Sequence, residues 1–298
     1  MPSATVKEFL QPGSHKEVVE LLVKHGERAL VVGGGTFLHG LVARGVLHQL
    51  DVLIDLQNAG LSYVKQERDA LAIGATTTFA ELAAVERIQS KPEFGAVLDA
   101  LQYPPAQIRN MATVGGCVAS ATPLFDLPVA FMTLDSSVRA VGPKGSREIG
   151  LHKFYLDYFE HVLERTELLT EVLVPKQPSR SASAFLKLET NANDLALLNV
   201  GVRVTLDEKG ACRDARVVVG GGIGKVPVRA VSCEDVLKGQ QPTLALLKES
   251  GNVVSLDIHP VSDFLTSAKY RSTVAKVFVR RALLRALDRL GVHLDEKS

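Results

Sequence analysis

The sequence predicts an α+β protein, because it contains both strand-like and helical patterns. Two or three domains are expected, because the 298 residues exceed the length of one average domain. Strand-like and helical patterns are mixed up to Pro175, whereas nearer the C-terminus strand-like runs come first and helical runs follow. The polar segment at 176–183 lies between these two parts and is typical of a domain boundary.

The composition is that of a folded protein. Hydrophobic residues make up 46% of the chain, which is ample for a packed core. The chain has 34 basic and 33 acidic residues, so its charge gives no reason to expect a nucleic-acid partner. The three cysteines lie far apart and form no CxxC pair, which argues against a metal or iron–sulfur site in this chain.

The sequence also bears on localisation. No apolar run reaches membrane-spanning length, and the N-terminus lacks the apolar core of a signal peptide. Sparse cysteines in odd number fit a reducing compartment. We therefore expect a cytoplasmic protein without a membrane span.

The first elements lead into a glycine-rich segment. Ser14 and Glu17 form a capping-box pattern, which predicts a helix that ends near Gly26. A short strand at 29–32 then runs into Gly33-Gly34-Gly35-Thr36. This strand–glycine order suggests a phosphate site, and the alternative interpretation is a tight turn.

Strands and helices are mixed between the first glycine segment and residue 102. Thr78 and Glu81 form a second capping-box pattern, and Pro104 disfavours helix at Tyr103. The predicted elements are a strand at 51–56, parallel or at a sheet edge; a strand pair at 61–65 and 70–74; and helices at 78–83 and 93–102.

A second glycine-containing segment, Arg109–Cys117, is predicted as a loop and places Thr113 before Gly115 and Gly116. Pro128 suits the first turn of a helix at 126–134. Strands are expected at 138–141 and 167–174, and the aromatic segment at 152–161 is interpreted as core packing.

The C-terminal part predicts an antiparallel sheet followed by helices. The glycine run at 220–224 is interpreted as a structural loop. The predicted strands are at 184–188, 195–206 and 215–220, and the helices at 232–237, 243–249 and 270–290.

The two glycine segments suit a diphosphate. Residues 33–38 and 113–117 contain no basic residue, although Arg109 is close by in sequence. The anion would therefore be bound by backbone N–H groups and by the hydroxyls of Thr36 and Thr113. Asp126 would then accept hydrogen bonds from ribose. The P-loop pattern is absent, and the Rossmann pattern fails because Leu38 stands where its third glycine belongs.

Four stretches recur in an order and spacing typical of one family: 33–38, 108–117, 126–128, and 270–271 with 280–283. The chain resembles the FAD-binding (medium) subunit of the molybdenum hydroxylases, a group that includes carbon monoxide dehydrogenase and the separate-subunit xanthine dehydrogenases. The most specific part of the resemblance is Thr113-Val114-Gly115-Gly116 followed by Asp126.

The resemblance implies a fold and its division. It implies a two-subdomain FAD-binding fold of the vanillyl-alcohol-oxidase or PCMH type, with subdomains at 1–56 and 57–177. A C-terminal domain with a small antiparallel sheet and a helix bundle would occupy 178–298.

The resemblance also implies the FAD-contacting residues. The diphosphate would lie against Gly34, Gly35 and Thr36 on one side and the 113–116 segment on the other, while Leu169, Lys187 and Tyr103 would lie near the isoalloxazine. The implied set is Val32, Gly33, Gly34, Gly35, Thr36, Phe37, Leu38, Tyr103, Ile108, Thr113, Gly115, Gly116, Cys117, Asp126, Leu169 and Lys187.

Several of these positions keep a second interpretation. Phe37 and Cys117 depart from the family, which usually has Asp or Ser at the first position and Asn at the second. Cys117 is either a small buried hydrophobe or an air-sensitive thiol. Lys187 can equally be a strand lysine that extends to solvent, and His39 is expected to be solvated or behind the residues that contact FAD.

The implied function is electron transfer. In complexes of this kind a large subunit carries the molybdenum cofactor, a small subunit carries two [2Fe–2S] clusters, and FAD in the medium subunit passes electrons to an external acceptor. No catalytic or metal-binding residue is then expected in this chain.

Two other functions are compatible with parts of the sequence. A stand-alone reductase resembling UDP-N-acetylenolpyruvoylglucosamine reductase would need an asparagine–proline segment, but Asn110 and Asn199 are followed by Met111 and Val200. A nucleotide-binding regulator without redox chemistry is supported only by the glycine segments.

Overall fold

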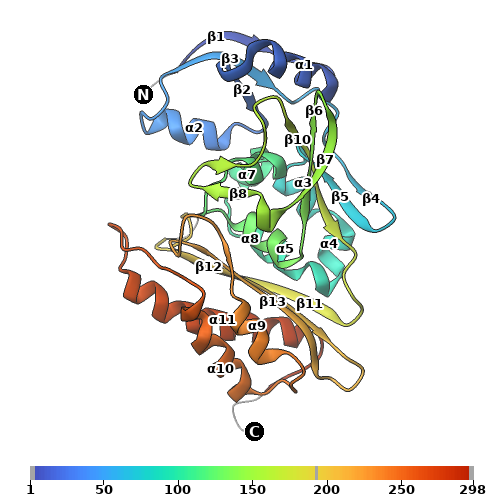
Figure 1. The fold of residues 1–298 in the computed structure, drawn as a ribbon, viewed down its shortest axis with the longest axis vertical. Helices are drawn as coiled ribbons and strands as arrows, with labels where there is room; N and C mark the ends of the chain where they lie inside the picture. The colour runs from blue at the N-terminus through green and yellow to red at the C-terminus, as the bar shows by residue number, and fades with distance from the viewer. Residues whose placement is uncertain (1–3, 192–193, 295–298) are drawn as a thin grey trace.

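The computed structural model describes residues 4–191 and 194–294 and confirms the predicted α+β class. A three-stranded sheet lies at one end of the molecule, a five-stranded sheet in the middle and a four-stranded sheet with its helices at the other end (Figure 1). Among the described residues, no helix is long and apolar enough to cross a bilayer.

The first sheet is parallel and presents the first glycine segment. β3 is its central strand and pairs with both β1 and β2, so the parallel part of the prediction is confirmed and the edge position is wrong. The sequence did not predict β1, because its residues are mostly exposed and show no alternation. The elements are β1 (Thr5–Leu10), α1 (His15–His25), η1 (Gly26–Arg28), β2 (Ala29–Val32), α2 (Thr36–Ala43) and β3 (Gln49–Asp55).

Both predicted capping patterns begin helices. Ser14 Oγ accepts from Glu17 N at the start of α1, but the Glu17 carboxylate accepts from Gly13 N instead of Ser14 N. Thr78 and Glu81 form the full reciprocal capping box of α3 (Phe79–Ala83). Each cap satisfies backbone N–H groups that the first turn leaves unbonded.

The second sheet has the strand order β4-β5-β10-β6-β7. β10 (Leu168–Pro175) is central and buried along nearly its whole length. The other strands are β4 (Val64–Gln66), β5 (Ala70–Gly74), β6 (Ser137–Gly142) and β7 (Gly145–Gly150). The remaining elements are α4 (Glu86–Ser90), η2 (Pro92–Phe94), α5 (Gly95–Ala100), α6 (Ala106–Met111), α7 (Val114–Ala119), α8 (Asp126–Thr133) and η3 (Leu151–Lys153).

The predicted loop at 109–117 is wrong. It consists instead of the end of α6, a two-residue connection and most of α7. Thr113 is the N-cap of α7, and its hydroxyl accepts from Gly116 N at 3.2 Å. The two glycines therefore lie in the first turn of a short helix, where they permit close packing that a larger residue would prevent.

The aromatic segment at 152–161 contributes to the core only in part. Phe154 is fully buried, as core packing predicts. Tyr158 and Phe159 instead lie at the tip of the hairpin β8 (Tyr155–Asp157) and β9 (Glu160–His161), where both are exposed. The core interpretation is therefore wrong for these two rings.

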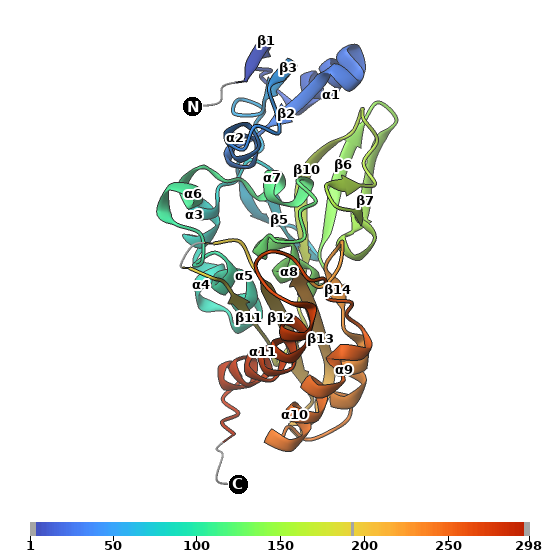
Figure 2. The ribbon, with the colours of Figure 1, turned by 90° about the vertical axis from the view of Figure 1, so that its left-hand side faces the viewer.

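The C-terminal sheet is antiparallel, with helices on both faces (Figure 2). α11 packs on β11 and β12, whereas α5 and α8 pack on the other face. Adjacent residues of β11 illustrate this, since Ala184 joins the C-terminal core and Phe185 joins the core shared by the first two sheets. The elements are β11 (Ser181–Leu188), β12 (Leu198–Leu206), β13 (Cys212–Gly221), β14 (Val228–Arg229), α9 (Val231–Leu237), α10 (Leu244–Val253), η4 (Val254–Leu256) and α11 (Ala268–Arg289).

A buried carboxylate joins the C-terminal sheet and α11 to the preceding domain. Asp99 on α5 accepts hydrogen bonds from Arg285 Nη2 at 2.7 Å, from Arg289 Nη2 at 2.7 Å and from Phe185 N at 3.0 Å. Since Phe185 is two residues before Lys187, Asp99 also fixes the strand that carries a predicted site residue.

Candidate cofactor site

The first glycine segment presents unbonded backbone N–H groups. β2 ends at Val32, and Gly35, with φ of 69°, is the N-cap of α2 without a side-chain hydrogen bond. Within the described residues, the N–H groups of Gly34, Gly35 and Thr36 have no protein acceptor. Free N–H groups at the start of a helix favour the binding of an anion, because they lie at the positive end of the helix dipole.

The two glycine-containing segments lie against each other. A Cβ added at Gly33 would be 2.6 Å from Thr113 Oγ1, and one at Gly34 would overlap the carbonyl oxygen of Met111. Only glycine permits this approach of the two backbones. The expectation that the two segments are close together is therefore confirmed, although they lie about 80 residues apart in sequence.

The second segment offers fewer donors than the sequence suggests. Val114 N donates to Thr77 O at 2.9 Å and Gly115 N donates to Ala75 O at 2.8 Å. A Cβ at Gly115 would be 2.5 Å from Ala75 Cβ, so this glycine is needed for packing. Thr113 can still donate its hydroxyl proton to a ligand, because its oxygen only accepts, from Gly116 N.

The Asp126 carboxylate is buried at the start of α8 and bound from two strands of the C-terminal sheet. Asn199 Nδ2 donates to Asp126 Oδ1 at 2.9 Å, and Lys187 Nζ lies 3.2 Å from Asp126 Oδ2. Burial raises the pKa of Asp126 above its usual range, while the nearby Lys187 and Asn199 act in the opposite direction. These contacts favour an ionised carboxylate in an apolar surrounding.

Lys187 is an interior residue. Its side chain is only 4% exposed, and Nζ also lies 3.2 Å from Glu189 Oε2 and 5.3 Å from the ring centroid of Tyr103. Tyr103 accepts a hydrogen bond from Lys187 N through its hydroxyl at 3.1 Å. The interpretation of Lys187 as a lysine that extends to solvent is therefore wrong.

Cys117 is buried close to this carboxylate. Burial raises the pKa of the Cys117 thiol, and the neighbouring Asp126 raises that pKa further. A protonated, inaccessible thiol is a poor nucleophile. The structure thus favours the small-hydrophobe interpretation over the reactive-thiol one.

Phe37 joins the first glycine segment to the Asp126 region. Its ring packs edge-to-face on Phe125, with centroids 5.8 Å apart, and stacks on Phe159 at 5.9 Å. Phe125 is the N-cap of α8 and immediately precedes Asp126. An aromatic residue at position 37 thus gives apolar contacts that the polar residues expected there would not give.

Most of the predicted residues fall into two connected groups. The first group holds the 33–37 segment and Thr113, and the second holds Tyr103, Cys117, Asp126 and Lys187. Ile108 is instead exposed on α6, and Leu169 is buried in β10. His39 is exposed on α2.

Sequence reasoning missed two polar groups beside Asp126, Asn199 and Glu189, and a third, Tyr155, beside Cys117. Asn199 is the most informative, since it is fully buried between Leu198 and Val200 in β12. A buried amide at such a position requires a hydrogen-bond partner, which was the available signal. The Tyr155 hydroxyl is buried near Cys117 and has no hydrogen-bond partner among the described residues.

The residues present therefore fit a dinucleotide. The free N–H groups of the 34–36 segment and the Thr113 hydroxyl can donate to its diphosphate, and the contact between the two glycine segments holds these donors close together. The buried Asp126 carboxylate can accept from a ribose or ribitol hydroxyl.

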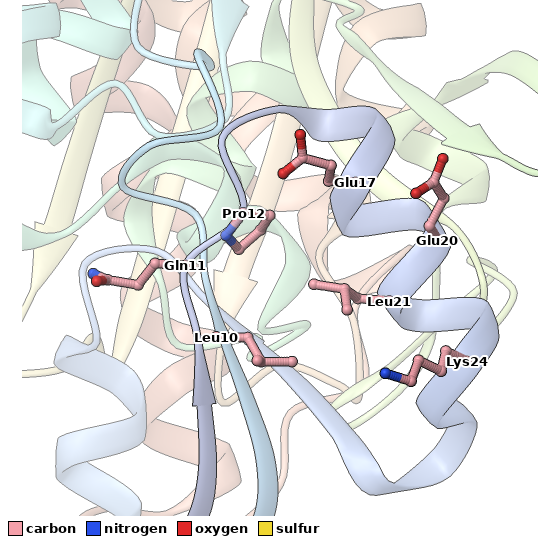
Figure 3. Close-up of a pocket in the computed structure, with 7 residues that line it drawn as sticks. All are labelled: Leu10, Gln11, Pro12, Glu17, Glu20, Leu21 and Lys24. Atoms are coloured by element: carbon pink, nitrogen blue, oxygen red, sulfur yellow. The ribbon is translucent and has the colours of Figure 1, made fainter.

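A separate surface hollow of about 360 Å³ lies between the end of β1 and α1 (Figure 3). None of the predicted FAD-contacting residues lines it. Its lining consists of Leu10, Gln11, Pro12, Glu17, Glu20, Leu21 and Lys24.

Comparison with family models covers nearly the whole chain. The model described as the FAD binding domain in molybdopterin dehydrogenase matches residues 4–177. The model described as the CO dehydrogenase flavoprotein C-terminal domain matches residues 183–286.

Individual proteins are similar over the same length. The 6-hydroxypseudooxynicotine dehydrogenase complex subunit alpha of Paenarthrobacter nicotinovorans is 30% identical, over 95% of this chain and 95% of its own. The carbon monoxide dehydrogenase medium chain of Afipia carboxidovorans is 29% identical, over 95% of this chain and 97% of its own. A solved structure of reconstituted CO dehydrogenase from Oligotropha carboxidovorans superposes with a TM-score of 0.90 at 27% identity, covering 97% of this chain and 99% of the other.

Proposed function

Because the chain belongs to the FAD-binding domain family of the molybdopterin dehydrogenases, we propose that it carries FAD as the electron-transfer subunit of a multi-subunit molybdenum-containing hydroxylase or dehydrogenase. The chain is an oxidoreductase component, and the resemblance stated from its motifs is confirmed. The observation that carries the proposal is the contact between the 33–35 segment and Met111 and Thr113 within that family's fold.

The FAD diphosphate is bound at this contact in our proposal. The N–H groups of Gly34, Gly35 and Thr36 donate to one side and the Thr113 hydroxyl donates to the other. Such donors solvate the anion without a basic side chain. Residues 1–56 and 57–177 are then the two FAD-binding subdomains, and 178–298 is the C-terminal domain.

The second group of residues orients the rest of the cofactor. Asp126 accepts from ribose or ribitol hydroxyls, and Tyr103 and Lys187 lie on the isoalloxazine side. When bound, FAD supplies the ability to accept single electrons and release them in pairs. The chain itself needs no proton-transferring residue for this task, and its contribution is to bind, orient and exclude water.

The proposed partners are a large subunit with the molybdenum cofactor and a small subunit with [2Fe–2S] clusters. The relatives' names, complex subunit alpha and medium chain, support assembly into a complex. Electrons would pass from the clusters through FAD to an external acceptor. The organic substrate would be selected in the large subunit.

Two measurements test this function. Protein purified after expression should show a flavin spectrum, and the flavin released by denaturation should co-elute with FAD and not with FMN. The complex isolated from the native source should contain molybdenum and iron in addition to flavin. A protein that takes up no FAD, or a flavoprotein isolated as a monomer without these metals, would contradict the respective part of the proposal.

A further inference from the structure

Asn199 reaches from the C-terminal domain to the start of α8. It is fully buried in β12, and its Nδ2 donates to Asp126 Oδ1 at 2.9 Å and to Phe125 O at 3.3 Å. The amide therefore contacts both the carboxylate and the residue that precedes it.

Lys187 holds the other carboxylate oxygen. It lies directly opposite Asn199 in the antiparallel register of β11 and β12, and its Nζ is 3.2 Å from Asp126 Oδ2. One cross-strand pair thus binds both oxygens of Asp126. Each oxygen has two lone pairs, so the carboxylate can still accept a hydrogen bond from a ligand.

We propose that Asn199 is a positioning residue for FAD, which acts by holding the Asp126 carboxylate fixed and ionised together with Lys187. The C-terminal domain then contributes to cofactor affinity through a residue that does not touch the cofactor. This inference rests on the proposed function, because it takes the ligand of Asp126 to be FAD.

The surroundings of Asp126 make the Asn199 contact important. Four other titratable groups face the carboxylate: Lys187, Glu189, Cys117 and Tyr103. Among them only Lys187 carries a positive charge, while Glu189 raises the pKa of Asp126 in addition to the effect of burial. The uncharged amide of Asn199 favours the ionised form of Asp126 and therefore offsets part of the free-energy cost of burying its charge.

The expected pH dependence follows from this arrangement. Asp126 accepts from a hydroxyl when it is ionised, so FAD affinity falls as the pH falls through the pKa of this carboxyl. Without the Asn199 donor the pKa of Asp126 is higher, because burial is then less compensated. Loss of affinity should consequently begin at higher pH.

The test uses the full-length, FAD-free chain titrated with FAD, with flavin fluorescence as the readout, from acidic to neutral pH. Asn199→Leu should weaken binding about tenfold to a hundredfold at neutral pH, as expected for a lost hydrogen bond to a charged group. The pH midpoint of binding should rise by about one unit. Asn252→Leu is the matched control, since Asn252 is exposed on α10.

A double-mutant cycle separates positioning from general destabilisation. In an Asp126→Asn background there is no charge to hold, so Asn199→Leu should change FAD affinity less than twofold and shift no midpoint. Thermal unfolding of each FAD-free variant reports on folding. If Asn199→Leu fails to fold, Lys187→Met removes the other contact and should raise the midpoint in the same direction.

The outcomes distinguish the two proposals. If the wild-type chain takes up no FAD, the proposed function itself fails. If the wild type binds FAD but Asn199→Leu binds with unchanged affinity and pH midpoint, or loses the same affinity in the Asp126→Asn background, the role of Asn199 is refuted and the function stands.

Discussion

The backbone of Gly34 lies so close to the carbonyl oxygen of Met111 that no Cβ fits between them. The contact joins the first glycine segment to the end of α6, across the boundary between two sheets. It also fixes the distance between the unbonded N–H groups of the 34–36 segment and the Thr113 hydroxyl, so its loss should be measurable.

Gly34→Ala should weaken FAD binding by about 1–3 kcal/mol, because one of the two backbones must shift to admit the methyl group. Equilibrium titration with FAD measures this loss. Gly40→Ala is the control, since Gly40 lies in α2 with open space at its Cβ position. If the two variants retain FAD equally well, the segments are not held by this contact.

Gly115→Ala should destabilise the protein even when FAD is absent. Its Cβ would be 2.5 Å from Ala75 Cβ, which predicts a loss of about 1–3 kcal/mol from overpacking. Urea unfolding of the FAD-free protein measures it, with Gly13→Ala as the control because its Cβ meets only one distant atom, Glu17 Oε2 at 3.9 Å. Normal stability combined with lost FAD would instead indicate that position 115 faces the phosphates.

Asp99→Ala should reduce the free energy of unfolding by about 1.5–3 kcal/mol. The change leaves Phe185 N without its acceptor and removes the buried partner of Arg285 and Arg289. The arginines are partly exposed and can regain water, which keeps the loss below that of a fully buried pair. Asp288 lies on the same helix as the two arginines and forms an exposed pair with His293, so Asp288→Ala should cost less than about 1 kcal/mol. An equal effect of both changes would contradict the role of Asp99.

The thiols should resist alkylation in the folded protein at mildly alkaline pH. All three cysteines are buried, and burial raises the pKa of Cys212 to about 11 and that of Cys233 to about 12. Both groups are then protonated as well as inaccessible, and the pKa of Cys117 is raised in the same direction. Mass spectrometry after iodoacetamide treatment should find no adduct without denaturant and three adducts with it. Rapid modification of Cys117 alone would revive its interpretation as a reactive thiol.

Local patterns predicted much of the fold. Ser14 and Thr78 begin helices as their capping patterns indicate, and the strand before Gly33 forms as expected. These signals depend on neighbours in sequence, so a single chain contains them in full. β1 escaped prediction because its side chains are exposed and show no alternation.

The sequence predicted several residues of the candidate site but not the contacts between them. The motifs named Asp126 and Lys187, yet their contact depends on packing between segments some 60 residues apart. The second glycine segment was predicted as a loop because glycine lowers helix propensity; tertiary packing of Gly115 on Ala75 overrides that preference. Asn199 was overlooked because its polar partner comes from another domain.

The contacts between Asp99 and α11 affect how cooperatively the chain unfolds. Asp99 of one domain accepts hydrogen bonds from a strand N–H and from two arginine side chains of a helix in the next domain. Unfolding of either domain would therefore leave these groups in the other domain without their partners. Two fragments made by cleavage after residue 177 should therefore each be less stable than the same part of the intact chain. Differential scanning calorimetry of the intact chain should show a single unfolding transition.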